Sequence, residues 1–309
     1  MHKGWKIHYS ICLGLIFMAA AVAAVQQGPT QTQTQARQPQ PAQYRQEPGP
    51  VTLEKITGDI YQVKGGSGAN GGVFVGEKEI LVIDAKMTAD SIKQMIAEIQ
   101  KISPNPIGLV ALTHSDGDHV NGLPGFPPDV RVIAHQETRR YMDEAFTEEA
   151  LRARLPQATF SEKLNLYIGS RRVEMLYFGP AHTSGDAVIY FPEERTAFLG
   201  DLLFVGRDPL IHRHKNGNSF GLVKVLRAVL ALDAEIFLSG HAEKATRADV
   251  EAMIKSLEDK QAQIKAMVGE GRSLEEIKKF FKIEDRPAQP GRPRFLSLPE
   301  VIYLELANK

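Results

Sequence analysis

Apolar residues in this chain form short β-prone runs separated by glycine and charged turns, beginning at residue 51. A stretch of helical length interrupts them at 89–102, where Ile92, Met95, Ile96 and Ile99 fall on one face of a helix. The runs that we interpret as strands of a first half are 51–56, 60–64, 73–75, 80–83, 107–112 and 130–134. This half of the chain is therefore expected to form a β-sheet covered by an amphipathic helix.

A second β-rich series follows a stretch of helical composition at 136–154. Its predicted strands are 164–168, 172–178, 187–191, 196–199 and 236–238. Helices are predicted at 222–232 and 247–268, next to these strands in the sequence. Two β-rich halves, each covered by helices, indicate an α/β fold of four layers, an αβ/βα sandwich, with a site at the rim where strand ends from both halves converge.

The N-terminal segment has the composition of a secretory signal peptide. Lys3 and Lys6 precede an apolar stretch at 11–25 that is shorter than a usual membrane span, and small residues occupy 21–24. Residues 25–50 are rich in glutamine and proline and are expected to form a disordered linker. We interpret 1–24 as a signal peptide, which implies a periplasmic or secreted protein. The alternative is an uncleaved N-terminal membrane anchor.

The rest of the chain divides into a predicted catalytic domain at 51–270 and a C-terminal helical extension at 271–309. The extension has two amphipathic stretches, 273–281 and 298–307, on either side of a proline-rich segment. Lys plus Arg and Asp plus Glu both number 37, so the formal net charge is zero and no nucleic-acid partner is expected. The single cysteine, Cys12, lies in the predicted signal peptide, which leaves histidines, carboxylates and bound water to carry the chemistry.

Candidate metal ligands crowd into the loop after the apolar run at 107–112. His114, Asp116, Asp118 and His119 lie within six residues of one another. An extended loop places His114 and Asp116 on one side, while Asp118 and His119 reach a second point nearby, which favours two metal ions over one. The alternative is a polar loop whose side chains only satisfy one another.

Three further candidates follow strand-like runs: His182, Asp201 and His241. The order and spacing resemble the metallo-β-lactamase superfamily, whose pattern is H-x-H-x-D-H, then a histidine in a Gly-His-Thr-like turn, then Gly-Asp, then Gly-His. The resemblance runs from about Ile60 to about His241. It implies the four-layer fold and a metal-dependent hydrolase.

The resemblance also implies a role for each candidate residue. The ligands would be His114, Asp116 and His182 for a first ion, Asp118, His119 and His241 for a second, and Asp201 between them. Asp118 would in addition orient the attacking water, and Asp84 would orient the ligand loop without binding metal. We expect two zinc ions and hydrolysis of an amide, lactam, ester or thioester, with a β-lactam as one candidate small-molecule substrate.

One position departs from the family pattern: the usual second histidine is Asp116 here. An anionic oxygen in place of an imidazole should lower the preference for zinc and favour iron or manganese, and flavodiiron proteins have a carboxylate at the same place. Two alternatives therefore stay open. The protein is an iron-dependent redox enzyme of the same superfamily, or it is a metal-binding module with a degraded first site.

Two loops are candidates for substrate contact. Residues 66–71 match G-x-G-x-x-G, but a strand follows them, so we reject nucleotide binding and expect a flexible hairpin tip in which Asn70 contacts substrate. The insert at 207–219 would be a lid that contacts substrate anions through Arg207, His212 or Lys215, or else a solvated polar loop.

Overall fold

The computed structural model describes residues 49–284 and 294–307. The predicted signal peptide, nearly all of the predicted linker and the proline-rich part of the C-terminal extension lie outside the described residues. The described residues belong to one compact unit, which extends from Glu47 to Lys309. Within that described part, no helix has both the length and the apolar composition needed to span a membrane.

The first sheet has seven strands in sequence order, antiparallel from β1 to β4 and parallel from β4 to β7. They are β1 (Thr52–Thr57), β2 (Ile60–Lys64), β3 (Gly71–Val75), β4 (Ile80–Ile83), β5 (Ile107–Ala111), β6 (Arg131–His135) and β7 (Ala158–Phe160). Helix α1 (Ala89–Gln100) crosses from β4 to β5, begins at the N-cap Thr88 and buries Ile92, Met95 and Ile99. The parallel pairing brings the carboxyl ends of β4 and β5 to the same edge of the sheet.

The second sheet has five strands in the order β12, β11, β10, β9, β8. They are β8 (Lys163–Ile168), β9 (Arg171–Tyr177), β10 (Ala187–Phe191), β11 (Thr196–Gly200) and β12 (Ile236–Ser239). Only the pair β11 and β12 is parallel among them, and helix α5 (Ser219–Leu230) makes the crossover between the two. Asp201 and His241 therefore follow two adjacent strands that end at the same edge.

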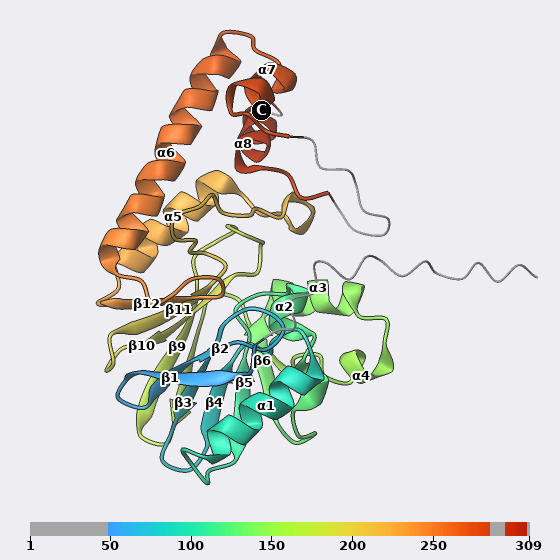
Figure 1. Ribbon diagram of the computed structural model, residues 1–309, viewed down its shortest axis with the longest axis vertical. Helices are drawn as coiled ribbons and strands as arrows, with labels where there is room; N and C mark the ends of the chain where they lie inside the picture. The colour runs from blue at the N-terminus through green and yellow to red at the C-terminus, as the bar shows by residue number, and fades with distance from the viewer. Residues whose placement is uncertain (1–48, 285–293, 308–309) are drawn as a thin grey trace, which may run out of the picture. The chain divides into compact units, whose positions relative to one another are not determined.

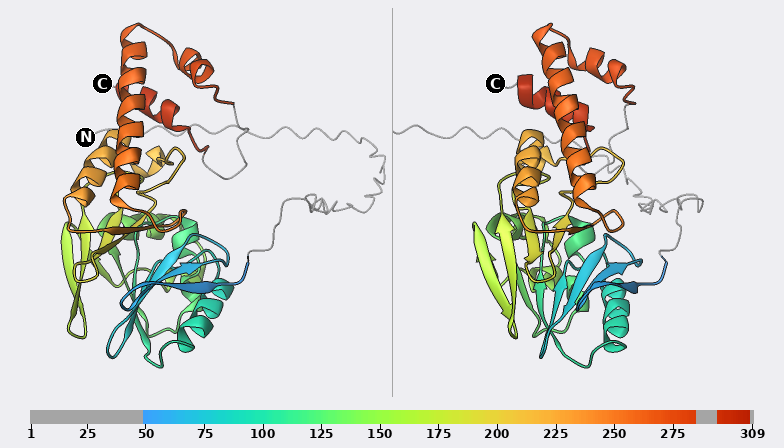
Figure 2. Two further views of the ribbon diagram at one scale, coloured as in Figure 1. Left: turned by 60° about the vertical axis from the view of Figure 1, so that its left-hand side comes forward. Right: turned by 90° about the vertical axis from the view of Figure 1, so that its left-hand side faces the viewer.

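Three buried clusters of apolar side chains separate four layers, which confirms the predicted αβ/βα sandwich. Phe74 of the first sheet meets Phe191 of the second between the sheets, with ring centroids 5.2 Å apart. A second cluster joins the first sheet to α1, and a third joins the second sheet to α5 and α6 (Arg247–Gly269). Figures 1 and 2 show α1 on the outer face of the first sheet and α5 and α6 beyond the second.

The two predicted C-terminal helices are confirmed as α7 (Leu274–Phe280) and α8 (Leu298–Ala307). Val301 and Ile302 of α8 are fully buried in the same cluster as α5 and α6, and Figure 1 shows α8 beside α6. Glu305 of α8 accepts a hydrogen bond of 2.9 Å from the backbone of Ser219, the first residue of α5. The C-terminal helices thus extend the core of the second half.

The secondary structure differs from the prediction in three places. The predicted helix at 136–154 is two helices, α3 (Gln136–Ala145) and α4 (Glu149–Arg152), because Phe146 leaves helical geometry at ψ 109° and buries its ring in the core. Strand β7 was not predicted, since three residues give too little alternation to recognise. Helix α5 also begins earlier than predicted, because the side chain of Asn218 caps it by accepting from the backbone N–H of Gly221.

Candidate metal centre

The loop after β5 carries four of the predicted ligands. It turns into the short helix α2 (Gly117–Val120), whose start is marked by a hydrogen bond from the backbone N–H of His119 to the carbonyl of Asp116. This turn brings His119 back over His114, with ring centroids 4.1 Å apart. Both histidines are buried. The loop therefore presents two histidines to one side rather than spreading them along an extended strand.

The remaining ligands come from three loops of the second half. His182 lies between β9 and β10, Asp201 directly follows β11, and His241 follows β12. Each of the last two is preceded by a glycine that allows close approach. A Cβ on Gly200 would lie 2.5 Å from Thr113 Oγ1, and a Cβ on Gly240 would lie 2.7 Å from His119 Cε1. The Gly-Asp and Gly-His pairs thus bring the two halves into contact at the site.

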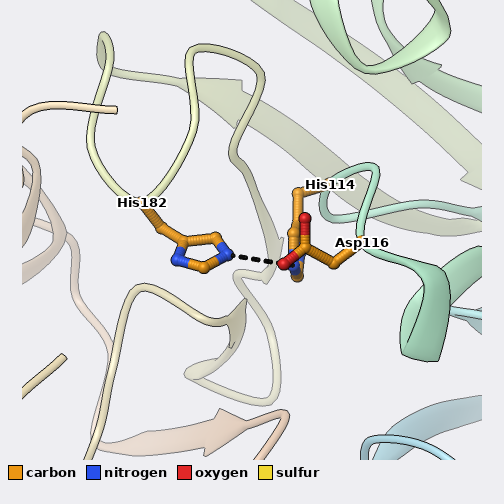
Figure 3. A group of neighbouring side chains, drawn as sticks. All are labelled: His114, Asp116 and His182. Carbon is orange, nitrogen blue, oxygen red and sulfur yellow. Dashed lines mark hydrogen bonds and ion pairs between the residues drawn. The ribbon is translucent and has the colours of Figure 1, made fainter. Parts of the chain in front are cut away.

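All seven predicted ligands are brought together in three overlapping groups. Within each group, one potential ligand atom from every member lies within 4.8 Å of the others. The groups are His114, Asp116 and His182, then His114, His119 and Asp201, then Asp118, His119 and His241. Figure 3 shows the first group, in which His182 reaches Asp116 from a different loop than the one carrying His114. Asp201 lies between the groups, with Oδ1 3.2 Å from His119 Nε2 and Oδ2 3.2 Å from His241 Nε2.

Hydrogen bonds behind the site decide which nitrogen of three histidines faces inward. His119 donates from Nδ1 to Asp84 Oδ2 at 2.7 Å, and His182 donates from Nδ1 to the carbonyl of Leu210 at 2.7 Å. His114 Nδ1 lies 3.0 Å from Thr113 Oγ1, whose own proton goes to Asp84 Oδ2. Each of these rings holds a proton on Nδ1, so Nε2 is the nitrogen that faces into the site and can offer its lone pair to a cation.

These lone pairs face carboxylate oxygens, which is unfavourable unless a cation lies between them. His182 Nε2 is 3.2 Å from Asp116 Oδ2. His114 Nε2, His119 Nε2 and Asp201 Oδ1 are buried and have no hydrogen-bond partner among the residues that the structure describes. Buried polar atoms left unpaired in this way are costly in a native protein. Imidazole nitrogens and carboxylates are ligands for divalent metals, so the residues present fit a metal centre.

The acid–base properties of these groups agree with a site that attracts cations. Burial would lower the pKa of His182, but its hydrogen bond to Asp116 and the nearby carboxylates raise it to about 9. Hydrogen bonds to Asp118 and Asp201 raise the pKa of His241 to about 9. Burial would raise the pKa of Asp201, yet the charge of His119 and the hydrogen bond of His241 hold it well below its usual value. Carboxylates therefore stay ionised here and bind either protons on imidazole or metal ions.

Asp84 takes the position predicted for it, behind the ligand loop. Its Oδ1 accepts from the backbone N–H of Thr113 at 2.8 Å, while Oδ2 accepts from Thr113 Oγ1 and from His119 Nδ1. The residue adopts the left-handed region with φ 61°. An aspartate tolerates this conformation better than most side chains. Asp84 thus fixes the orientation and the tautomer of His119 without reaching the inner face of the site.

Lys86 is a functional candidate that the sequence analysis missed. Its side chain is 1% exposed, and its ammonium donates to the backbone carbonyls of Gly68 and Ala69. Burial lowers the pKa of Lys86 to about 8, against the opposing influence of Asp118 and Asp84. Its place two residues after Asp84, at the end of an apolar strand, was the available signal. The contact fixes the glycine-rich loop next to the second group of ligands.

The loop at 66–71 joins β2 to β3 and leads into a strand, in agreement with the rejection of nucleotide binding. The expectation that it is flexible was wrong. Ala69 donates to the carbonyl of Asp118 at 3.1 Å, and Asn70 donates from its backbone to Gly240 at 2.7 Å. The side-chain amide of Asn70 donates to the carbonyl of Ala242 at 3.0 Å. The loop thus ties two ligand loops together, and substrate contact by Asn70 stays a prediction.

The insert at 207–219 reaches the site through two residues that contact Asp116. His212, which is buried, places Nε2 2.6 Å from Asp116 Oδ2, and Lys215 places Nζ 2.7 Å from Asp116 Oδ1. A solvated loop is therefore the wrong description for these two side chains. Arg207 is exposed, with its guanidinium 4.6 Å from the ring centroid of Phe204, which in turn stacks on His241. Contact of Arg207 or His212 with substrate stays a prediction.

A cavity of about 560 Å³ lies between the insert and the C-terminal helices. Arg207, Leu210, Lys282 and Phe295 are among its lining residues. The ring centroid of Phe295 is 5.3 Å from that of His212, so the cavity borders the ligand groups on the side of Asp116. Its lining is both apolar and charged, and it includes none of the seven candidate metal ligands.

The sequence of this chain is similar to a known protein family and to several characterised proteins. Residues 65–241, more than half of the 309-residue chain, match the family model described as the Metallo-beta-lactamase superfamily. The chain is 26% identical over 216 residues to the 2,4-dinitroanisole O-demethylase subunit alpha of Nocardioides sp. (strain JS1661), covering 68% of this chain and 62% of that protein. It is 22% identical over 234 residues to the linear primary-alkylsulfatase of Pseudomonas sp. (strain ATCC 19151), covering 60% of this chain and 44% of that protein.

The chain thus spans less than two thirds of the length of both curated relatives. A solved structure, a metallo-beta-lactamase from Pontibacter korlensis, superposes with a TM-score of 0.59 and 16% identity over 67% of this chain and 99% of the other. At this identity the likeness concerns the fold alone.

Proposed function

Because the chain belongs to the metallo-β-lactamase superfamily, we propose that it is a hydrolase that uses two divalent metal ions, with zinc as the first candidate. The observation that carries this proposal is the convergence of four histidines and three carboxylates from loops of both sheets, with the buried Nε2 atoms of His114 and His119 left without a hydrogen-bond partner among the described residues. Such a ligand set matches dinuclear hydrolytic sites, whereas a structural zinc site would be closed by four ligands around a single ion.

The first ion would be held by His114, Asp116 and His182, the second by Asp118, His119 and His241, with Asp201 between them. Ions held in this way supply an activated water and polarise the bond that is broken. The chain contributes the fixed geometry of these groups. Hydrogen bonds at Nδ1 already orient His114 and His119 with Nε2 inward, and burial holds the pKa of His114 well below its usual value, so that ring has no proton on Nε2 to displace.

Asp118 is the residue that we assign to orienting the attacking water. Its Oδ2 lies 3.2 Å from His241 Nε2, and its side chain is 22% exposed, more than that of Asp201 at 5%. It thus reaches the open side of the site, where substrate and water arrive. The hydrogen bond to His241 keeps the pKa of Asp118 below its usual value despite its burial, so it acts as a carboxylate that accepts a hydrogen bond.

The substrate class extends over amides, lactams, esters and thioesters, with a β-lactam as one candidate. One relative is by name an alkylsulfatase, which adds sulfate esters to the substrates that deserve a test. The test is a hydrolysis screen with a chromogenic lactam, a lactone, a thioester, a phosphodiester and an alkyl sulfate, run on protein whose metals have been identified. Two zinc ions per chain with turnover of at least one of these substrates supports the proposal. Turnover that persists after metal removal contradicts it.

A second candidate is an iron-dependent redox enzyme, and Asp116 is the observation that favours it. A carboxylate at this position is a harder ligand than imidazole and suits iron better. Protein purified without added metal would then contain iron and consume dioxygen with a reductant. Zinc content with no dioxygen consumption excludes this candidate.

We also propose that the protein is exported and acts in the periplasm or outside the cell. The support is the signal-like composition of 1–24. Sequencing the N-terminus of the protein recovered from a periplasmic fraction tests this. Cleavage close to Ala24 is the expected result, and an intact N-terminus in the membrane fraction would instead support an anchor.

A further inference from the structure

The carboxylate of Asp116 has an unusual set of partners for a metal ligand. Oδ2 lies 3.8 Å from His114 Nε2 and 3.2 Å from His182 Nε2, so this oxygen faces the first ion's position. The same oxygen is 2.6 Å from His212 Nε2, and the other oxygen is 2.7 Å from the ammonium of Lys215. Both added partners come from the insert at 207–219, outside the ligand motifs. Lys215 is also held in place, because it donates to Ser115 Oγ at 3.0 Å.

His212 differs from His114, His119 and His182 in the hydrogen bonding of its Nδ1. Those three donate from Nδ1 to Asp84, Thr113 or Leu210 and turn Nε2 inward. No described residue hydrogen-bonds Nδ1 of His212, while its Nε2 lies at donor distance from a carboxylate. The proton of a neutral His212 therefore belongs on Nε2, where it is donated to Asp116. His212 has the hydrogen bonding of a donor to Asp116, and it lacks the anchor that the inward-facing ligands share.

We propose that His212 and Lys215 make Asp116 a charge-compensated ligand of the first ion: His212 orients Oδ2, and Lys215 cancels the negative charge that Asp116 introduces. The family's pattern provides a neutral histidine at this position. Here His114, Asp116 and His182 together carry one negative charge, and the Lys215 ammonium returns their sum to zero. This inference rests on the proposed function, because it takes the first group of residues as a metal site.

The two positioning residues are expected to act in opposite directions on metal affinity. Lys215 is a cation close to the first ion, so the unit charge that it carries opposes binding of that ion. Lys215→Met should therefore bind the first zinc ion about tenfold more tightly, while Lys215→Arg, which keeps the charge, should bind it like the wild type. His212→Phe removes the hydrogen bond that aims Oδ2 and should bind it about tenfold more weakly, whereas His212→Gln keeps a donor and should recover most of this loss.

The measurement is the dissociation constant of each zinc ion, obtained by competition with a chromophoric chelator on the full folded protein. The absorption spectrum of the cobalt-substituted protein gives a readout that is independent of activity, because it reports the ligand field at the first ion. Lys224→Met is the matched control: Lys224 is an exposed lysine on α5, and its removal should leave both constants unchanged.

The outcomes separate this inference from the proposed function. Tighter binding in Lys215→Met and weaker binding in His212→Phe support it. Weaker binding in both variants would mean that the insert has only a structural role, and equal binding in Lys215→Met and wild type would remove the charge compensation; either result overturns the inference. Fewer than two zinc ions in the wild-type protein would instead contradict the proposed dinuclear site.

Discussion

The residues assigned to the first ion (the first group: His114, Asp116 and His182) and those assigned to the second (the second group: Asp118, His119 and His241) differ in how their key members are held. In the second group, His119 is fixed from behind by Asp84, which lies at the end of β4 and is 3% exposed. In the first group, Asp116 is fixed from the other half of the molecule by His212 and Lys215 of the insert. The second group is thus built into the ends of the strands, whereas the first depends on a loop that lies a hundred residues further along the chain.

If Asp116 binds the first ion as proposed, this difference shows how a ligand can change its chemical type without loss of the site. An aspartate in place of a histidine adds a negative charge and a second oxygen that must be satisfied. The ammonium of Lys215 balances the negative charge. Lys215 contacts one oxygen of Asp116 and His212 the other, so both oxygens have a partner. The departure at Asp116 and the insert at 207–219 are therefore two parts of one feature.

The largest effect is expected at the second group. His119→Ala removes a buried ligand that belongs to two of the three groups and leaves Asp84 without its imidazole partner. We expect the loss of one zinc ion per chain and a fall in hydrolysis of about a thousandfold or more, since the leaving group loses its electrophile. Metal analysis and turnover of the best substrate measure this. The control is His214→Ala, because His214 is an exposed histidine of the insert. If His119→Ala keeps activity within a few-fold of wild type, the assignment of His119 as a ligand is contradicted.

Asp116→His tests the first group. The substitution restores the family's usual ligand but places a neutral ring against the Lys215 ammonium, whose charge is then uncompensated. The first zinc ion should bind about tenfold more weakly or worse, although imidazole is a good zinc ligand. The double variant Asp116→His with Lys215→Met should recover the affinity. If the single variant already binds zinc more tightly than wild type, Lys215 does not compensate Asp116.

Much of this centre was predictable from the sequence, because its ligands follow strand ends in a specific order. The motif around His114, together with His182, Asp201 and His241, led to the residues that converge, and the alternating apolar runs led to both sheets. The ligands inside each motif lie at fixed spacings along the chain, and such spacings can be recognised in the sequence. The order of the β-rich halves and the helices was sufficient to predict the four layers of the fold.

The contacts of the insert were not predictable, because they join positions far apart in the chain. Nothing in the sequence places Lys215 against Asp116, about a hundred residues away. A run of histidine and lysine occurs as often in solvated loops as in loops that reach a site. The same reason applies to Lys86, whose burial depends on how the loop at 66–71 folds over it. Phe146 ended a helix for a tertiary reason, since burying its ring outweighed continuing the helix.

Asp84→Asn sharpens the comparison by weakening the support behind the second group alone. An asparagine keeps the size of the side chain, but its amide nitrogen cannot accept the proton that His119 donates from Nδ1. We expect the second zinc ion to bind about ten- to a hundredfold more weakly, with the first ion affected less. Chelator competition resolves the two constants. An equal loss at both ions would mean that Asp84 supports the whole loop through Thr113 and not His119 in particular.

The smallest effect concerns the protein after its metals are removed by a chelator. Without metal, protons on His182 and His241 take the place of cations, and their pKa values are about 9 in the folded chain against about 6.5 when unfolded. A raised pKa favours the folded state fully below pH 6.5, and this contribution disappears as the pH rises through 9. The metal-free protein should therefore lose several degrees of Tm between pH 6.5 and pH 9, while carboxylates remain ionised throughout.

The metal-loaded protein should lack this loss, because metal binds more tightly as the competing protons leave. Asp116→Ala divides the effect between the two groups: it removes the hydrogen-bond partner that raises the pKa of His182 and leaves the partners of His241 in place. Its metal-free form should show a smaller fall in Tm over the same range. Thermal unfolding of the wild type and of Asp116→Ala, each with and without zinc, gives the change in Tm between pH 6.5 and pH 9 for these four samples. A metal-free protein that gains stability over this range would show that His182 and His241 do not carry the protons assigned to them.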